Sequence, residues 1–236
     1  MSSSLDYTYE FNDGEVITVQ QDADILGATV WDSCLVLSKF VEKALERLAK
    51  TGFGGAGTRA AGASKLRPTR ILELGAGCGL LGLVAAHVLP TADVFVSDVE
   101  KVLPILGRNS NGNTNVVPLV LEWLSEAQCN GKSPLPDNVK QILPVDIILI
   151  SDCVYDEECF APLNHTLYAL CEANPNTLVI MAYERRKFDT EVSFFKQFGE
   201  KFRFRHVLLE DLDPRYSAPE EIYVFLAKLR VDKEDF

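Results

Sequence analysis

The chain opens with short alternating segments, followed by a long helical pattern. Residues 7–11 and 15–19 alternate between polar and apolar positions around Asn12-Asp13-Gly14, a turn sequence typical of β-hairpins. From Thr29 to Lys50 the apolar residues recur at helical spacing, which predicts one amphipathic helix. Residues 52–62 are small and rich in glycine, and such a segment indicates a flexible linker.

Strand-like and helix-like segments then alternate along the rest of the chain. The predicted strands are Arg70–Leu74, Val94–Ser97, Val116–Val120, Val145–Ser151 and Thr177–Ala182. The predicted helices are Gly79–Leu89 and segments near Val102–Arg108, Phe160–Cys171 and Glu191–Phe198. The fourth strand is almost wholly apolar, which is typical of a parallel strand buried on both faces.

The end of the chain departs from this alternation. Phe202–Leu208 and Glu221–Lys228 read as two strands with no helix between them, so an antiparallel pair is expected. The fold class predicted is therefore α/β, a Rossmann-like, doubly wound and mostly parallel seven-stranded sheet that ends in an antiparallel strand pair. We expect one domain over residues 1–236, with the hairpin, helix and linker in 1–69 and the core in 70–230.

The charge balance narrows the choice of partner. Acidic residues outnumber basic ones by 34 to 23, which gives a formal net charge of −11. This balance opposes binding to a nucleic-acid backbone, which requires clustered lysine and arginine. It would attract a basic protein or peptide, although an acidic surface most often serves only solubility.

Neither a membrane nor a metal is indicated. No run of about eighteen apolar residues occurs, and the first residues lack the features of a signal peptide, so we expect a cytoplasmic protein with the nucleus as a second compartment. The six cysteines form no C-x-x-C pair, and the three histidines lack metal-ligand spacing. Free, buried thiols are the expectation.

The first predicted strand of the core runs into a glycine-rich turn, Gly75-Ala76-Gly77-Cys78-Gly79. In a doubly wound sheet the ligand lies beyond the carboxyl ends of the strands, usually against this turn. Glycines allow the backbone to approach a ligand closely. Asp98 closes the second strand, where an acidic residue can accept hydrogen bonds from ribose hydroxyls. Gly75, Gly77 and Asp98 are therefore predicted to bind a cofactor.

Two kinds of cofactor compete for this turn. Gly77-x-Gly79-x-x-Gly82 matches the dinucleotide fingerprint, whereas Gly75-x-Gly77-x-Gly79 begins directly where the apolar strand stops. Glu73 precedes the first glycine by two residues, where a carboxylate can meet the cationic amino-acid group of S-adenosylmethionine but would repel a pyrophosphate. The joint pattern favours S-adenosylmethionine.

Six short motifs carry a family resemblance. They are Val30-Trp31-Asp32, the segment from Ile71 to Leu80, Ser97-Asp98, Leu121-Glu122-Trp123, Ser151-Asp152-Cys153-Val154-Tyr155 and Tyr183-Glu184-Arg185-Arg186. From about Val30 to its end, the chain resembles the methyltransferase-like seven-β-strand protein-lysine methyltransferases that modify non-histone proteins. The resemblance implies that Trp31 and Trp123 border the adenosine of S-adenosylmethionine and that Ser151 lies beside it. Two tryptophans could also serve packing alone.

Asp152 and Tyr155 are the predicted catalytic residues. An acceptor lysine must lose its proton to attack, and an apolar channel lowers the pKa of an amine whereas a carboxylate alone raises it. Asp152 is therefore expected to orient the amine and guide proton loss, and Tyr155 to form an aromatic wall. The alternative for Asp152 is a turn or helix-capping residue after a buried strand.

The acceptor is the least determined part of the prediction. The resemblance points to an accessible lysine of a folded cytosolic protein such as a translation elongation factor or a chaperone. The hairpin, the long helix and the acidic segment Glu210–Asp213 offer more surface than a free amino acid requires. The glycine turn is indifferent to the acceptor, so a small-molecule or nucleic-acid amine methyltransferase stays an alternative, as does a non-catalytic cofactor-binding module.

Overall fold

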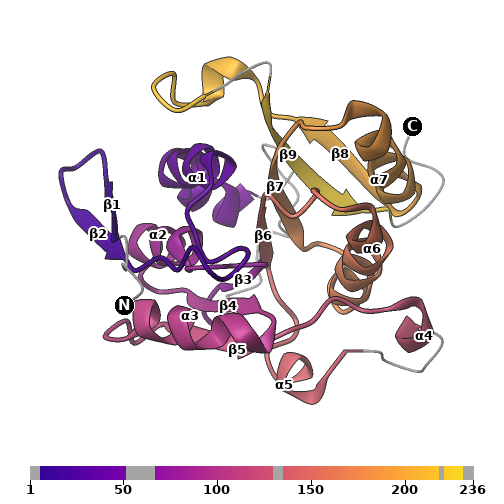
Figure 1. The fold of residues 1–236 in the computed structure, drawn as a ribbon, viewed down its shortest axis with the longest axis horizontal. Coiled ribbons are helices and arrows are strands. Elements are labelled where there is room, and N and C mark those ends of the chain that lie inside the picture. The colour runs from indigo at the N-terminus through magenta and orange to yellow at the C-terminus, as the bar shows by residue number, and fades with distance from the viewer. Residues whose placement is uncertain (1–5, 52–66, 130–134, 218–220, 231–236) are drawn as a thin grey trace.

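The structure, a computed structural model, describes residues 6–51, 67–129, 135–217 and 221–230. Its centre is a seven-stranded sheet with helices on both faces (Figure 1). The strands are β3 (Arg70–Leu74), β4 (Asp93–Asp98), β5 (Val116–Val120), β6 (Ile147–Ser151), β7 (Leu178–Glu184), β8 (Phe202–His206) and β9 (Ile222–Leu229). All contain the β-branched, aliphatic or aromatic side chains that suit a buried sheet.

The strand order confirms the predicted fold class. The strands lie in the order β5-β4-β3-β6-β7-β9-β8. Neighbours from β5 to β7 are parallel, whereas β9 runs antiparallel to both β7 and β8. The chain winds outward from β3 to β5 and then returns to β6 and β7 on the other side. The winding reverses between β3 and β6, which is where such sheets bind ligands.

Two layers of helices cover the sheet (Figure 1). The layer on one face holds α1 (Asp32–Thr51), α2 (Leu80–Val88) and α3 (Leu103–Ser110). The layer on the other face holds the longer α6 (Glu157–Glu172) and α7 (Phe188–Lys201) with two short helices, α4 (Glu126–Cys129) and α5 (Asp137–Lys140).

Each face of the sheet has its own hydrophobic core. On β3, Ile71 faces α1 and α2, whereas Leu72 and Leu74 pack towards α6 and α7. This follows from the alternation of side chains along a strand. The same alternation places Glu73 on the face of Ile71, under α2, with consequences for the site.

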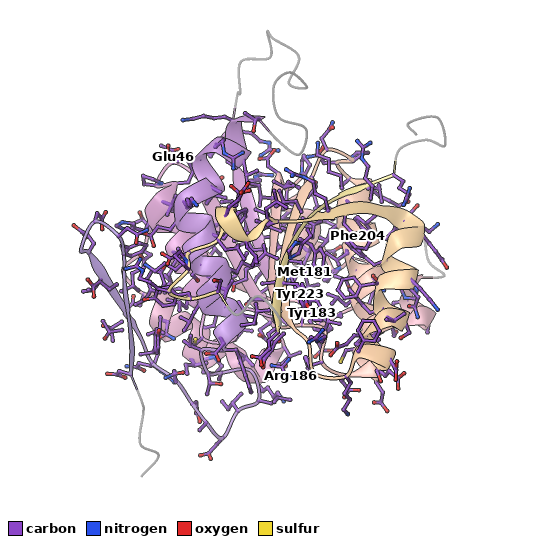
Figure 2. All side chains as sticks on the ribbon, turned by 90° about the horizontal axis from the view of Figure 1, so that it is seen from above. Glu46, Met181, Tyr183, Arg186, Phe204 and Tyr223 are labelled. Carbon is purple, nitrogen blue, oxygen red and sulfur yellow. The ribbon has the colours of Figure 1, made fainter. Side chains whose placement is uncertain are left out.

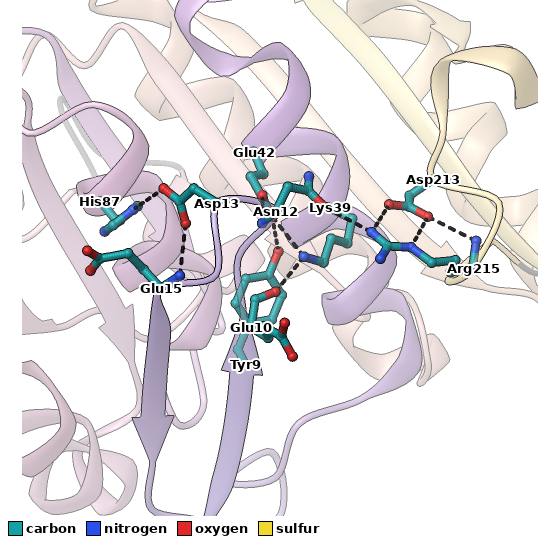
Figure 3. Close-up of polar contacts among 10 residues, drawn as sticks. All are labelled: Tyr9, Glu10, Asn12, Asp13, Glu15, Lys39, Glu42, His87, Asp213 and Arg215. Carbon is teal, nitrogen blue, oxygen red and sulfur yellow. Dashed lines mark hydrogen bonds and ion pairs between the residues drawn. The ribbon is translucent and has the colours of Figure 1, made fainter.

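The predicted N-terminal hairpin forms and packs on the first core. Its strands are β1 (Tyr7–Glu10) and β2 (Val16–Val19), paired antiparallel. Lys39 of α1 ties the hairpin to this helix, because its Nζ donates to the Glu10 carbonyl at 2.6 Å (Figure 3). Within α1, the same Nζ forms a buried ion pair with Glu42 Oε2 at 2.9 Å. The Tyr9 hydroxyl also donates to Glu42, at 2.8 Å. The hairpin is therefore held at a defined place on α1.

Several predicted boundaries were wrong by a few residues. The helix predicted from Thr29 begins at Asp32, because residues 22–31 form turns. The fourth strand begins at Ile147 rather than Val145, and the last helix extends over Phe188–Lys201. Neither α4 nor α5 was predicted, since each is too short to show a helical period. The predicted linker at 52–62 lies outside the described residues. Within the described ranges, no helix has the length and apolarity needed to cross a membrane.

Candidate active site

A cavity of about 1320 Å³ lies at the point where the winding of the sheet reverses. Every parallel strand contributes to its lining through the residues at or just beyond its carboxyl end. All predicted site residues except Glu73 and Gly77 line it, namely Trp31, Gly75, Asp98, Trp123, Ser151, Asp152 and Tyr155. The fold therefore gathers into one cavity residues that are far apart in the sequence.

Gly75 is the glycine of the turn that faces the cavity directly. Its φ of 62° lies in the left-handed region, which strains any residue with a side chain. A Cβ added there would lie 2.7 Å from the Cys153 sulfur and 3.4 Å from Trp123 Cζ2. Gly75 thus leaves open the space between β3 and the Trp123 ring.

Gly77, which is predicted to bind the cofactor, is not among the residues that line the cavity. Its φ is also positive, at 56°, and a Cβ there would overlap the carbonyl oxygen of Gly27. Its amide donates to Asp98 Oδ2 at 2.8 Å. Gly77 is therefore needed for the close approach of another backbone segment.

Asp98 joins the end of β4 to the glycine turn. Its Oδ2 accepts from the Gly77 amide, and its Oδ1 accepts from the Val99 amide at 2.7 Å. Burial raises the pKa of Asp98, while these two backbone donors oppose that rise. Each carboxylate oxygen can accept more than one hydrogen bond, so Asp98 can still receive ribose hydroxyls.

Glu73, which is predicted to meet the amino-acid group of the cofactor, is buried under α2. It is 1% exposed and does not line the cavity. Its Oε2 accepts from the Gly82 amide of α2 at 2.8 Å. Burial raises the pKa of Glu73 to about 8, so the carboxyl is mostly protonated at neutral pH. The sequence argument missed this because it considered the position along β3 and not the face of the strand.

Both tryptophans line the cavity. Trp31 directly precedes α1, and its carbonyl accepts from the amides of Cys34 and Leu35 in the first turn. Its side chain is 43% exposed at the cavity mouth. Trp123 follows β5, is half-buried, and lies beside Gly75. Both rings are therefore available to a bound ligand.

Ser151 ends β6 beside the start of α1. Its side chain hydrogen-bonds with the thiol of Cys34, whose pKa is raised by burial. Cys34, Cys78, Cys153, Cys159 and Cys171 are free, and the first four of them line the cavity. Burial raises the pKa of Cys78 to about 11, so these thiols act as small apolar groups at neutral pH.

Asp152 adopts an uncommon backbone conformation. Its φ of 56° makes it the one non-glycine residue with positive φ in the described part of the chain. Aspartate tolerates this region better than most residues, and strained residues cluster at functional sites. Its amide donates to the Ala182 carbonyl of β7 at 2.9 Å, which fixes the turn after β6. It is not a helix cap: the capping residue of α6 is Asp156.

Tyr155 follows Asp152 in the loop after β6 and lines the cavity, with 47% of its surface exposed. Burial of its hydroxyl end, with a smaller contribution from Cys159, raises the pKa of Tyr155 to about 12. A phenol with this pKa stays protonated at neutral pH and cannot serve as a base. Tyr155 lines the cavity, and its role as an aromatic wall stays a prediction.

Arg186 also lines the cavity, and although it belongs to a motif that carries the resemblance, it was not predicted as a site residue. It follows β7, and its two terminal nitrogens donate to the two oxygens of Asp152, each at 2.7 Å. Nη2 also donates to Glu184 Oε2 at 2.7 Å, and the guanidinium lies 5.7 Å from the centre of the Trp31 ring. The available signal was an arginine just after a predicted strand, at the same edge of the sheet as the predicted carboxylate Asp152.

The segment 22–31 forms a second wall that the sequence did not indicate. Leu26, Gly27 and Thr29 line the cavity. The segment is anchored by turn hydrogen bonds and by Ala28, which packs with Val102 and Ile105 of the neighbouring layer. A segment of turns has neither helical nor alternating periodicity, so its sequence does not indicate that it forms a cavity wall.

The cavity residues fit S-adenosylmethionine. Gly75 leaves room against the first strand, Asp98 offers acceptors for ribose hydroxyls, and the aromatic faces of Trp31 and Trp123 suit an adenine or a sulfonium. The first turn of α2 begins without an acidic residue, after Gly79 with a φ of 82°. These residues would hold the cofactor.

Known proteins similar to this chain include several protein-lysine methyltransferases. The Protein N-lysine methyltransferase METTL21A of Mus musculus is 29% identical over 226 residues, covering 93% of this chain and 86% of that protein. The Protein-lysine N-methyltransferase EFM6 of Saccharomyces cerevisiae is 28% identical over 201 residues, covering 78% and 77% of the two chains. The similarity thus spans both sequences.

Solved structures share the fold at low sequence identity. A SAM-dependent methyltransferase from Agrobacterium tumefaciens has a TM-score of 0.55 at 12% identity, over 97% of this chain and 71% of that one. The family model described as lysine methyltransferase matches residues 11–201, which include every predicted site residue. By this match, the chain belongs to the lysine methyltransferase family, whose enzymes transfer a methyl group from S-adenosylmethionine to a lysine side-chain amine.

Proposed function

We propose that the acceptor is an exposed lysine of a folded, non-histone protein in the cytoplasm, with the nucleus as a second compartment. Translation elongation factors and chaperones are the first candidates, on the strength of the sequence resemblance. The single observation that carries a protein acceptor is the apolar rim of the cavity, defined here as Leu26, Trp31 and Tyr155. These side chains are 67%, 43% and 47% exposed. Exposed apolar patches around a cavity are typical of protein interaction sites.

The apolar rim continues onto α7. Phe188 is 64% exposed and lies in a groove of about 270 Å³ that also contains Val192 and Phe195. Glu191 lines both this groove and the cavity, so the two are adjacent. A free amino acid would not need this surface, whereas a protein surface around the lysine would cover it.

Exposed carboxylates also line the cavity. Glu100, Glu122, Asp156 and Glu157 are exposed at the cavity. Together with the overall charge of −11, they favour a cationic acceptor over a nucleic acid. Rim charges act mainly on the association rate, so capture of the substrate should depend on salt.

Each residue of the site then has a chemical role in lysine methylation. When bound, S-adenosylmethionine supplies an electrophilic methyl group. Asp152 orients the approaching amine and guides loss of its proton, since its carboxylate lies at the end of β6 beside the cavity. Tyr155 and Trp31 exclude water and present aromatic faces to the cationic amine. Orientation of this kind is a large part of catalysis in a bimolecular displacement.

The class of acceptor can be tested with labelled S-adenosylmethionine and a cell extract. We expect label in protein, at lysine, and none with the Asp152→Asn variant. Label in RNA or in small molecules would contradict a protein acceptor. A purified elongation factor and a short peptide with the same lysine are then compared at low and high salt. Faster and salt-sensitive methylation of the intact protein is expected.

The apolar rim and the adjacent groove on α7 can be tested with matched serine variants. Leu26→Ser and Phe188→Ser should raise the KM for the intact protein acceptor and leave the affinity for S-adenosylmethionine within about threefold. Val16→Ser is the control, because Val16 is 59% exposed but does not line the cavity. Equal KM values for all three variants would show that the apolar rim does not contact the acceptor protein.

A further inference from the structure

The pairing between Arg186 and Asp152 engages both oxygens of the carboxylate predicted to receive the acceptor amine. Both Asp152 oxygens accept from Arg186 at 2.7 Å, in the two-point geometry that suits guanidinium and carboxylate. The Asp152 side chain is 7% exposed, whereas that of Arg186 is 32% exposed. Arg186 is thus the more exposed member of the pair.

The surroundings of the guanidinium are those expected for a bound lysine ammonium. Arg186 contacts two carboxylates, Asp152 and Glu184, and lies over the Trp31 ring at 5.7 Å. Carboxylates and an aromatic face are the groups that bind ammonium ions in proteins. Figure 2 shows Met181, Tyr183 and Arg186 in succession, with Arg186 outermost. The Arg186 side chain is part of the cavity lining and is reached by solvent.

We propose that Arg186 is a specificity-determining residue that occupies the place of the acceptor ammonium, and that the substrate lysine must displace it from Asp152. The inference rests on the proposed role of Asp152 as the group that orients the amine. Arginine cannot lose its proton under these conditions, so it can hold the carboxylate without competing as a methyl acceptor in place of lysine.

The structure offers Arg186 places to go when it leaves Asp152. Nη2 already bonds to Glu184, so the guanidinium can stay paired while it rotates away. Glu191 is a second carboxylate nearby, with Oε1 accepting from the amides of Arg186 and Lys187 at 2.8 Å. Its buried Oε2 has no hydrogen-bond partner among the described residues. The Arg186 guanidinium therefore keeps a carboxylate partner when it leaves Asp152.

A displaceable arginine discriminates between large and small acceptors. A free amine brings only its own attraction to Asp152, which must replace an existing ion pair. A protein acceptor adds contacts with the rim and can supply the difference. The enzyme would thus bind small amines and short lysine peptides poorly.

The test is the binding of n-butylammonium to enzyme loaded with S-adenosylhomocysteine, followed by NMR. We expect Arg186→Met to bind this probe about tenfold more tightly than wild type. Adding Asp152→Asn to Arg186→Met should remove the gain. With a blocked lysine as methyl acceptor, Arg186→Met should lower KM about tenfold and change kcat by less than about threefold. A merely structural role would lower kcat and leave KM unchanged.

Arg185→Met is the matched control, since Arg185 donates to the Tyr223 hydroxyl at 3.4 Å and does not line the cavity. It should behave as wild type in both assays. Unchanged probe binding in Arg186→Met, with weaker binding in Asp152→Asn, would overturn the inference alone. Probe binding that is insensitive to Asp152→Asn in either background would overturn the role of Asp152 and the inference with it. Cofactor affinity and thermal unfolding of each variant report on folding.

Discussion

Gly77 packs so closely against Gly27 that a Cβ on Gly77 would overlap the Gly27 carbonyl oxygen. This contact joins the glycine turn after β3 to the segment 22–31 that closes one side of the cavity. The Gly77 amide also holds Asp98. One glycine therefore sets the positions of two cavity walls, although it does not face the cavity.

Gly77→Ala should therefore weaken cofactor binding by displacing the wall that contains Leu26 and Trp31. We expect a loss of affinity for S-adenosylmethionine of at least about tenfold, with some loss of stability from the positive φ. Calorimetry measures both. Gly107→Ala is the control, since its Cβ would meet nothing within 4 Å and its φ is not positive; alanine there should stabilise α3 by up to about 1 kcal/mol. Normal affinity in Gly77→Ala would refute the coupling.

Asp152→Asn should abolish methylation while leaving cofactor affinity within about threefold, as expected for a group that acts on the acceptor. Asparagine is chosen because it tolerates the φ of 56° at this position, whereas alanine adds backbone strain. The measurement is the single-turnover rate on a protein acceptor with labelled S-adenosylmethionine. Appreciable activity in Asp152→Asn would show that the negative charge is not required.

Cofactor binding should change the intrinsic fluorescence of the protein. The chain has 2 tryptophans, and both Trp31 and Trp123 line the cavity. Titration of Trp31→Phe reports on Trp123, and titration of Trp123→Phe reports on Trp31. We expect a saturable change in both variants. A variant that binds S-adenosylmethionine by calorimetry without a fluorescence change would show that its remaining tryptophan does not adjoin the cofactor.

Glu73 should make the cofactor-free protein less stable as pH rises. Its pKa is about 8 when folded and near the ordinary 4.5 when unfolded, so between these values the folded protein binds the extra proton. Stability then falls with rising pH by up to about 1.4 kcal/mol per unit, and levels off above about pH 8. Glu73→Gln keeps the acceptor for the Gly82 amide and should flatten this fall. The measurement is the free energy of unfolding by denaturant from pH 5 to 8, for wild type and Glu73→Gln. The same pH dependence in both proteins would contradict a buried neutral carboxyl.

Lys39→Met should destabilise the protein by about 3 kcal/mol, because it leaves the Glu42 carboxylate without its buried ionic partner. The side chains of Lys39 and Glu42 are 2% and 10% exposed. The double variant Lys39→Met with Glu42→Gln should recover part of the loss. Lys43→Met, on the exposed side of α1, should cost less than about 1 kcal/mol. A loss no larger than that of Lys43→Met would show that the buried pair contributes little.

The sequence alone was sufficient for the main elements of the fold. Apolar runs such as Ile147–Ser151 predict buried strands because burial on both faces requires apolar side chains at every position. The glycine turn and Asp98 could be predicted as cavity residues because a strand end and a tight turn are local features. The element boundaries and the short helices α4 and α5 could not be predicted. A single helical turn is too short to show a period.

Only the tertiary structure decided which neighbours these residues have. The face of β3 placed Glu73 under α2, and the approach of Gly27 gave Gly77 a role unlike that of Gly75. Arg186 reaches Asp152 across 34 residues of sequence. Such contacts depend on strand order and on the path of the connecting loops. Local patterns of hydrophobicity record burial and backbone preference, and they contain no information on which loop meets which at the carboxyl edge of the sheet.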